Sequence, residues 1–146
     1  MKHDIDSLII EREVRIAAPP QTVFGFLTDP RKYVRWKGRH AQLDPRPGGV
    51  FRVDFGDGTD VARGEFVEVV PYRRVVFTWG WEGSGAVPPG TSVVEIDLEP
   101  SGSGTLLRLI HRGLPVPAIA SHLEGWDRFL PQLAAVAGGG DASGGA

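Results

Sequence analysis

The feature that most constrains the fold of this chain is a series of short segments, between Gly48 and His111, in which apolar and polar residues alternate. A period of two is typical of strands that bury one face and expose the other. Turns containing glycine or proline separate the segments, so we expect an antiparallel meander with one covered face. The alternating apolar positions are Phe51, Val53 and Phe55, then Val75, Phe77, Trp79 and Trp81, then Val94, Ile96 and Leu98, and finally Leu107 and Leu109, with a further strand over residues 61–70.

The C-terminal part of the chain has a different period. Apolar residues recur at steps of three and four, which predicts one amphipathic helix of about 30 Å ending at Ala137. Two starts are open, because Pro117 suits a first turn whereas a capping box of Ser121 and Glu124 favours a start near His122. Pro131 is expected to bend this helix. The recurring positions are Ile119, His122, Leu123, Trp126, Leu130 and Leu133.

The N-terminal part predicts one strand and two short helices. Residues 9–17 alternate like a strand with charged residues on one face. Pro19-Pro20 ends that strand and starts a short helix, which Asp29-Pro30 stops. A second helical turn is expected to carry Tyr33 and Trp36.

Together these elements predict a single α+β domain. The chain has 146 residues, the size of one domain. A sheet with one wet face needs cover on the other face, and only the C-terminal helix is long enough to supply it. Curling the sheet around that helix leaves an interior that is either a filled core or a cavity. We expect an N-terminal extension over residues 1–7, the domain over 8–137 and a flexible Gly/Ser/Ala tail over 138–146.

Composition excludes several classes of protein. The chain has no cysteine, which excludes a disulfide scaffold, a thiol nucleophile and an iron–sulfur protein. Its formal net charge of −2 gives no general attraction to nucleic acid. No apolar run approaches the roughly 18 residues of a membrane span, and the N-terminal residues do not form a signal peptide. We therefore expect a cytoplasmic protein.

Several short motifs resemble one family. The chain is similar to the bacterial domains named after the C-terminal part of the heat-shock-protein-90 ATPase activator, which belong to the START-like (SRPBCC) superfamily. The resemblance covers about residues 8–137 and implies the helix-grip fold, with a cavity between the sheet and the long helix, but no defined reaction. The residues that carry it are Val14–Pro20, Leu27–Pro30, Asp44–Gly49, Gly64-Glu65, Phe77–Trp79, Gly104-Thr105 with Leu107, Leu109 and His111, and His122 with Gly125-Trp126.

Residues on the covered faces are candidates for binding a ligand. They either fill a packed core or line a pocket, and a pocket of this kind is mainly apolar with a few placed polar groups. Trp36 either roofs the cavity mouth or packs on the final helix. The ligand-binding candidates are Trp36, Phe51, Val53, Phe55, Phe77, Trp79, Leu107, Leu109, His111, His122, Trp126 and Leu130.

Three polar residues fall on otherwise apolar faces: Arg12, His111 and His122. Each must find a partner, because a buried polar group without one is costly. His111 either contacts a ligand or is a hydrogen-bonded core residue, and His122 either joins it or reaches solvent. Glu65 lies on a strand whose phase leaves its face open; if it faces inward near His111, the two form a general acid/base pair.

Other clusters favour structural explanations. Asp54, Asp57 and Asp60 fit hairpin chemistry better than a calcium loop, and no metal site or cofactor is expected. The basic stretch from Arg31 to Arg39, which includes Lys37, is expected to be a solvated face. Leu106 and Ile110 should lie on the outer face of their strand, where they suggest a homodimer interface.

Three functions remain open after this reading. The first is a domain that binds a small hydrophobic or amphipathic molecule between the sheet and the C-terminal helix. The second is a cyclase- or dehydratase-like enzyme that uses His111, with Glu65, as acid and base in the same cavity. The third is a chaperone-linked module that binds a protein partner through its surface.

Overall fold

The computed structural model describes residues 9–56, 58 and 60–139. Its sheet has seven strands in the order β1-β7-β6-β5-β4-β3-β2, and every neighbouring pair is antiparallel. The strands are β1 (Ile10–Ile16), β2 (His40–Leu43), β3 (Val50–Asp54), β4 (Val61–Val70), β5 (Arg74–Trp79), β6 (Ser92–Ser101) and β7 (Gly104–Arg112).

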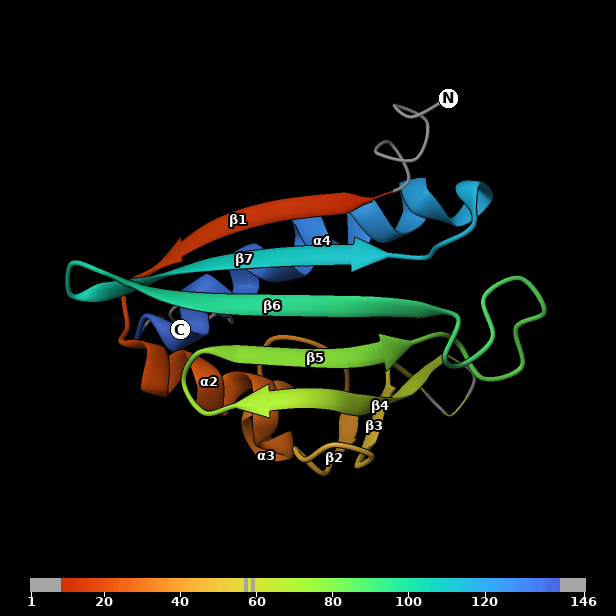
Figure 1. The fold of residues 1–146 in the computed structure, drawn as a ribbon, viewed down its shortest axis with the longest axis horizontal. Coiled ribbons are helices and arrows are strands. Elements are labelled where there is room, and N and C mark those ends of the chain that lie inside the picture. Colours follow the sequence, from red (N-terminus) through yellow and green to blue (C-terminus); the bar gives the residue numbers. More distant parts are fainter. Residues whose placement is uncertain (1–8, 57, 59, 140–146) are drawn as a thin grey trace.

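Three helices cover one face of this sheet. Helices α2 (Pro20–Thr28) and α3 (Pro30–Tyr33) follow β1, and the long helix α4 (Val116–Ala137) follows β7. Figure 1 shows α4 running behind β1 and β7, and α2 and α3 behind the other half of the sheet. Each helix has a proline in its first turn, where the missing N–H has no intrahelical partner to lose.

The register places the alternating apolar residues on the helix-facing side. Strand β1 pairs with β7 so that Ile10 lies opposite His111, and β7 continues against β6 with Leu109 opposite Ile96. All four of these residues are almost fully buried. At the other end, Phe51 stacks on Phe77 with ring centroids 4.0 Å apart, which joins β3 to β5 across β4.

The close approach of β4 to β5 depends on a glycine. A Cβ atom built on Gly64 would overlap the backbone carbonyl of Thr78, so no larger residue fits while the strands keep this spacing. The Thr78 hydroxyl in turn accepts a hydrogen bond from the N–H of Glu65 at 2.9 Å.

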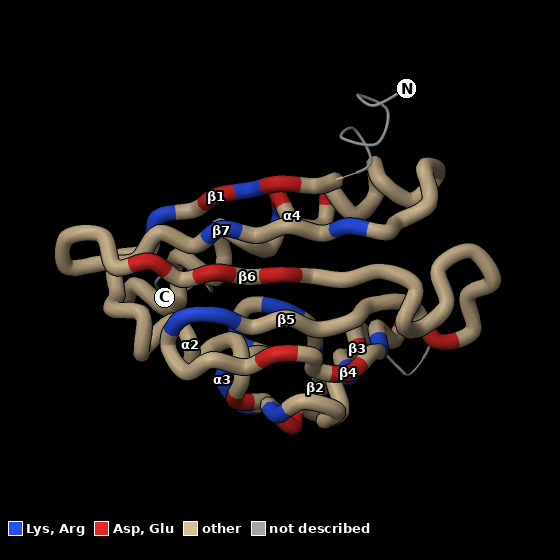
Figure 2. Tube along the Cα trace, in the orientation of Figure 1, with Lys and Arg blue, Asp and Glu red and all other residues tan. Residues whose placement is uncertain are grey.

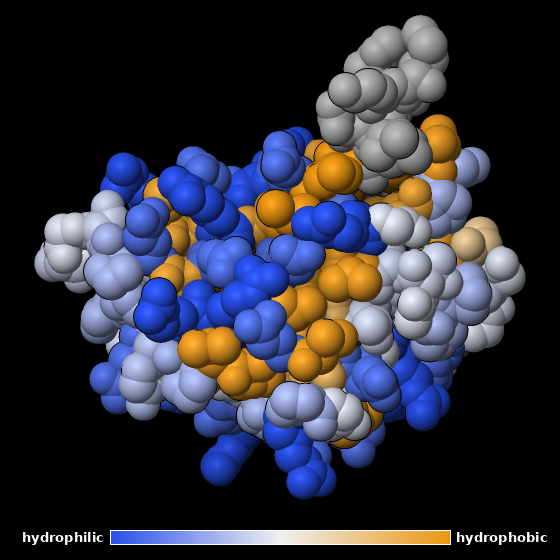
Figure 3. Space-filling view, viewed as in Figure 1, coloured by the Kyte–Doolittle hydropathy of each residue, from blue (hydrophilic) through white to orange (hydrophobic). Residues whose placement is uncertain are grey.

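The outer face of the sheet carries paired charges. The acids of β6 lie between arginines of β5 and β7 (Figure 2). Arg74 of β5 contacts both Asp97 and Glu95, and Arg112 of β7 contacts Glu95 at 3.0 Å. Apolar side chains fill the spaces between these pairs (Figure 3). Leu106 and Ile110 lie half-buried on this face, as the alternation of β7 requires.

The expected α+β fold is confirmed, as a curved antiparallel sheet with a long C-terminal helix packed on it and short helices after β1. Of the two starts considered for α4, the one at Pro117 is right: the helix begins at Val116. The capping box is wrong, because the Ser121 hydroxyl donates to the carbonyl of Ala118 within the helix. Strand β2 was not predicted from the sequence.

Three expectations concern residues outside the part of the chain that the structure describes. The N-terminal extension of residues 1–7 and most of the C-terminal tail lie outside the described residues, as does Asp57 of the β3–β4 hairpin. Asp54 of that hairpin accepts hydrogen bonds from the N–H groups of Gly56 and Gly58, which confirms turn chemistry for it. Among the residues described, no helix has both the length and the hydropathy to cross a bilayer.

Candidate functional site

The side chain of Lys37 is buried among aromatic rings. The backbone N–H of Lys37 donates to the carbonyl of Tyr33, one turn earlier, so the two residues share a helical face. That face points into the domain, and Lys37 is only 4% exposed. Its Nζ lies 3.7 Å from the ring centroid of Trp126 and 4.4 Å from that of Trp79. The basic stretch was expected to be solvated throughout, and for Lys37 that expectation is wrong.

Lys37 lies at one side of a small pocket between the end of β5 and helix α4. The pocket has a volume of about 260 Å³. Its walls are mainly aromatic and are completed by one turn of α4, where Gly125 leaves open space in place of a side chain. The remaining lining residues are Trp79, Trp81, Ser121, His122, Trp126 and Phe129.

A chain of hydrogen bonds runs behind this pocket. The indole N–H of Trp126 donates to Nδ1 of His111 at 3.1 Å. The neutral imidazole must then carry its proton on Nε2, which donates to the Ser92 hydroxyl at 2.8 Å. The Ser92 hydroxyl in turn donates a hydrogen bond to the carbonyl of Trp79 at 3.0 Å. Both nitrogens of His111 are therefore occupied by protein groups.

A second pair repeats the arrangement nearer the surface. The indole N–H of Trp81 donates to Nε2 of His122 at 3.0 Å. The His122 ring therefore carries its proton on Nδ1, which donates to the Ala118 carbonyl at 2.8 Å. The two imidazoles stand edge to face with centroids 5.5 Å apart.

Burial disfavours the protonated form of all three bases at this site, Lys37, His111 and His122. It lowers the pKa of Lys37 well below the usual value for lysine. It also lowers the pKa of His111 to about 3, with smaller contributions from the nearby His122 and Lys37. The pKa of His122 is lowered by its burial and by Lys37, against the hydrogen bond to Ala118 that raises it.

Two donors at this site have no acceptor. Trp79 Nε1 is buried and is hydrogen-bonded to no group within the described part of the chain. The side chain of Lys37 takes part in none of the hydrogen bonds or ion pairs found among the described residues, and its contacts are with ring faces. A buried N–H without a partner is unusual and calls for an explanation.

The chain was compared with models of known protein families. Residues 17–138 match the family model described as Activator of Hsp90 ATPase homolog 1-like protein. The chain belongs to this family. Among solved structures, an AHSA1-like protein of Rhizobium etli is 48% identical with a TM-score of 0.72, over 91% of this chain and 83% of that one.

Two further relatives are longer than this AHSA1-like domain. DynU16, from the dynemicin biosynthetic locus, is 29% identical with a TM-score of 0.78, over 92% of this chain and 49% of its own. The uncharacterised protein C1711.08 of Schizosaccharomyces pombe is 25% identical over 116 residues, which are 77% of this chain and 32% of that protein. The chain thus spans about half of one and a third of the other.

The AHSA1-like domain brings only part of the expected ligand-binding set to the pocket. Trp79, His122 and Trp126 line it, Phe55 packs half-buried on Trp81 and Phe129, and His111 lies behind Trp126. Trp36 does not line the pocket; it is buried beside Lys37 and donates its N–H to the carbonyl of Phe26. The others are almost fully buried in the core: Phe51, Val53, Phe77, Leu107, Leu109 and Leu130.

The structure separates Glu65 from His111. Phe66 faces the core and pairs with Phe77, so Glu65 points to the other face of the sheet, where it is exposed. His111 faces the interior and is fully buried. The two residues share no site at which an acid and a base could act on one substrate. Arg12 lies on the helix-facing side of β1, where it binds Asp127 of α4 at 2.7 Å.

Several residues at or behind the pocket were not predicted as site residues, although the sequence contained a signal for each. Lys37 is four residues from Tyr33, which was expected to lie on a helical turn. Ser92 is in phase with Val94 on β6, and Trp81 is in phase with Trp79. Phe129 follows Trp126 by one helical turn. The period places all four residues on the covered side, whereas the polar side chains of Lys37 and Ser92 alone would suggest exposure.

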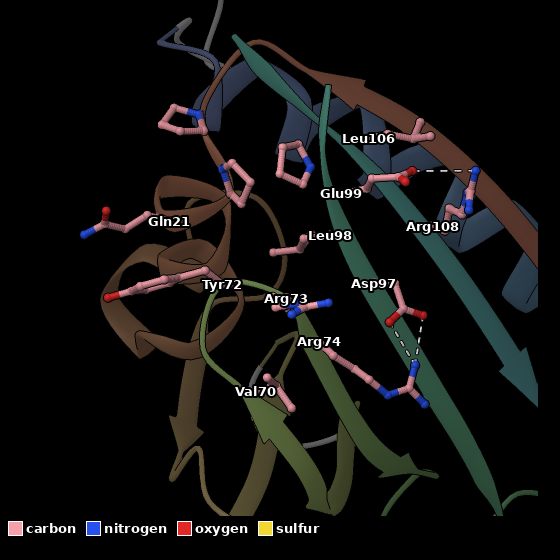
Figure 4. A pocket seen from close by; sticks show the side chains of 13 residues that line it. Gln21, Val70, Tyr72, Arg73, Arg74, Asp97, Leu98, Glu99, Leu106 and Arg108 are labelled. Carbon is pink, nitrogen blue, oxygen red and sulfur yellow. Dashed lines mark hydrogen bonds and ion pairs between the residues drawn. The ribbon is translucent and has the colours of Figure 1, made fainter. Parts of the chain in front are cut away.

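A wider groove lies on the outer face of this AHSA1-like domain. It has a volume of about 960 Å³ and runs between the start of α2, the β4–β5 turn around Tyr72, and β6 (Figure 4). Its charged side chains largely satisfy one another: Arg74 contacts Asp97 at 2.9 Å, and Arg108 contacts Glu99 at 3.8 Å. The inner pocket, by contrast, contains the donors without acceptors.

Proposed function

We propose that this domain binds a small, largely apolar ligand in the pocket between β5 and α4. The observation that carries the proposal is the composition of the pocket wall, in which Trp79, Trp81, Trp126 and Phe129 surround a space of about 260 Å³. Ligand sites are typically concave, apolar and aromatic, with few polar groups. A pocket of this volume suits a molecule of one or two rings.

The order of the surrounding hydrogen bonds supports a preformed site. His111 and His122 are each held at both nitrogens, so the tryptophans that they fix cannot turn without breaking a hydrogen bond. Rigid walls lower the cost of ordering on binding. The occurrence of a relative in the dynemicin biosynthetic locus agrees with a small molecule as the ligand.

A single substitution can fill the pocket without replacing any of its aromatic wall residues. A Cβ on Gly125 meets no atom within 4 Å, and Gly125 lines the pocket. The variant Gly125→Leu therefore places a side chain in the space where the ligand would lie, and it replaces a poor helix former by a good one. Glu124→Leu adds the same side chain one residue earlier, at an exposed position outside the pocket.

The test is a binding screen of the purified protein by native mass spectrometry and thermal shift against a library of one- and two-ring compounds. We expect compounds that raise the Tm of the parent protein and of Glu124→Leu, and that bind Gly125→Leu at least tenfold more weakly. A parent protein that binds nothing in the library, or a Gly125→Leu variant that binds as the parent does, would overturn the proposal.

A further inference from the structure

Among the described residues, the polar groups at the pocket offer more hydrogen-bond donors than acceptors. His111, His122 and Ser92 each have partners for both their donor and acceptor functions. The groups left over, Lys37 and the indole N–H of Trp79, are both donors. A ligand that satisfied them would have to bring acceptor atoms.

The charges are unbalanced in the same direction. Lys37 is the lysine at the pocket and becomes cationic when it is protonated, and the titratable groups that face it are His111 of β7 and His122 of α4, which are bases as well. The ion pairs among the described residues use the carboxylates elsewhere, as in Arg12 with Asp127 and Arg74 with Asp97. A buried ammonium without a counter-ion is costly, whereas a paired one recovers much of that cost.

The rings around Lys37 account for part of the stabilisation that its ammonium needs. Trp126 and Trp79 present their faces to Nζ, and Phe55, Phe129 and Trp36 lie within 6 Å of it. Cation–π contacts of this kind stabilise a desolvated ammonium. They supply no hydrogen-bond acceptor, so the N–H bonds of Lys37 stay unmatched.

From this donor excess we infer that the ligand of the pocket is a small aromatic carboxylate, whose anionic group binds the protonated form of Lys37 while its ring lies against the tryptophans. The inference rests on the proposed function, because it names the chemistry of a ligand in the same pocket. A hydrogen bond between a charged donor and a charged acceptor contributes about 1.5–3 kcal/mol, which corresponds to a ten- to hundredfold preference over a neutral analogue.

The test uses 2-naphthoate and its neutral analogue 2-naphthamide, which have the same ring system and almost the same shape. Binding of both is measured by isothermal titration calorimetry to the parent protein, to Lys37→Met and to Lys32→Met. Lys32 is the matched control, because it belongs to the same basic stretch but is exposed and has its Nζ 5.9 Å from the ring of Phe26.

We expect the parent and Lys32→Met to bind 2-naphthoate at least tenfold more tightly than 2-naphthamide, and Lys37→Met to lose this preference while still binding the amide. If the parent protein bound 2-naphthoate and 2-naphthamide with equal affinity, the inference of a carboxylate ligand would be wrong, whereas the proposed apolar pocket would still be supported. A preference that persists in Lys37→Met would overturn the role of Lys37. If the parent binds neither compound, both this inference and the proposed pocket for two-ring ligands fail.

Discussion

The indole of Trp126 on α4 donates its N–H to Nδ1 of His111 on β7, at 3.1 Å and out of contact with solvent. This bond joins the helix to the sheet at the back of the pocket. It also fixes the tautomer of His111, which in turn orders Ser92. The position of one wall of the pocket is thus determined by a neutral histidine.

Stability should depend on pH through His111. Its pKa is lowered to about 3 in the folded protein, against about 6.5 in the unfolded chain. Above pH 6.5 neither state protonates the ring; between pH 6.5 and 3 only the unfolded chain does, so stability falls as the pH is lowered. At about 1.4 kcal/mol per pKa unit the loss is a few kcal/mol. Urea unfolding from pH 7.5 to 4 should show it, and His111→Gln should flatten that slope; an unchanged slope would contradict a neutral His111.

Removing the Trp126 donor should destabilise the domain. In Trp126→Phe an aromatic ring is kept, but the smaller side chain leaves a gap and Nδ1 of His111 loses its indole donor in a buried place. A buried acceptor left unpaired costs about 1–3 kcal/mol. Trp81→Phe is the matched control, because it removes the same bond from the half-buried His122, where water can replace the indole. Chemical denaturation should give a clearly smaller loss for Trp81→Phe, and equal losses would count against this explanation.

Replacing Lys37 by methionine should stabilise the free protein near neutral pH. Burial lowers the pKa of Lys37, which means that burial disfavours the positive charge that this lysine carries in the unfolded chain at pH 7. This cost reduces the free energy of unfolding. Met fills similar space without a charge, and we expect a gain of about 1–2 kcal/mol. The gain should shrink as pH rises toward 10.5, where the lysine of the unfolded chain also becomes neutral. Thermal unfolding of both proteins from pH 7 to 10 measures this, and a gap that widens with pH would refute it.

The spacing of β4 and β5 should not tolerate a side chain at position 64. Gly64→Ala places a methyl group against the carbonyl of Thr78, and the strands must separate to admit it. We expect a loss of about 3 kcal/mol or more, or failure to fold. Gly85→Ala is the control, because its Cβ meets no atom within 4 Å. Circular dichroism and denaturation of the two variants should differ sharply, and a Gly64→Ala protein as stable as Gly85→Ala would contradict the model of the sheet.

The fold could be predicted because its signals are local. Alternation along β5, β6 and β7, turn residues between them and a helical stripe near the C-terminus each depend on neighbours in sequence. Strand β2 was missed because its four residues, His40–Leu43, are too short to show a period and pair with β3 on one side only.

The pocket was harder to predict because it depends on how side-chain volumes add up across the interior. Leu107 and Leu109 are as apolar as the pocket walls, and nothing in their pattern says that helix α4 covers them completely. Lys37 illustrates the opposite error: its charge suggested solvent, whereas its position one turn after Tyr33 leads inward. Residue type and position disagreed, and position was right.

The pairing of β1 with β7 determines when the molecule can be completed. Ile10 pairs with His111, about a hundred residues later in the chain, so β1 has no strand partner until β7 has been synthesised. At ribosomal rates of about 5–20 residues per second, that interval is on the order of ten seconds. The first strand of the domain therefore has no strand partner until all the other strands have emerged, and helix α4, which forms one wall of the pocket, is synthesised later still.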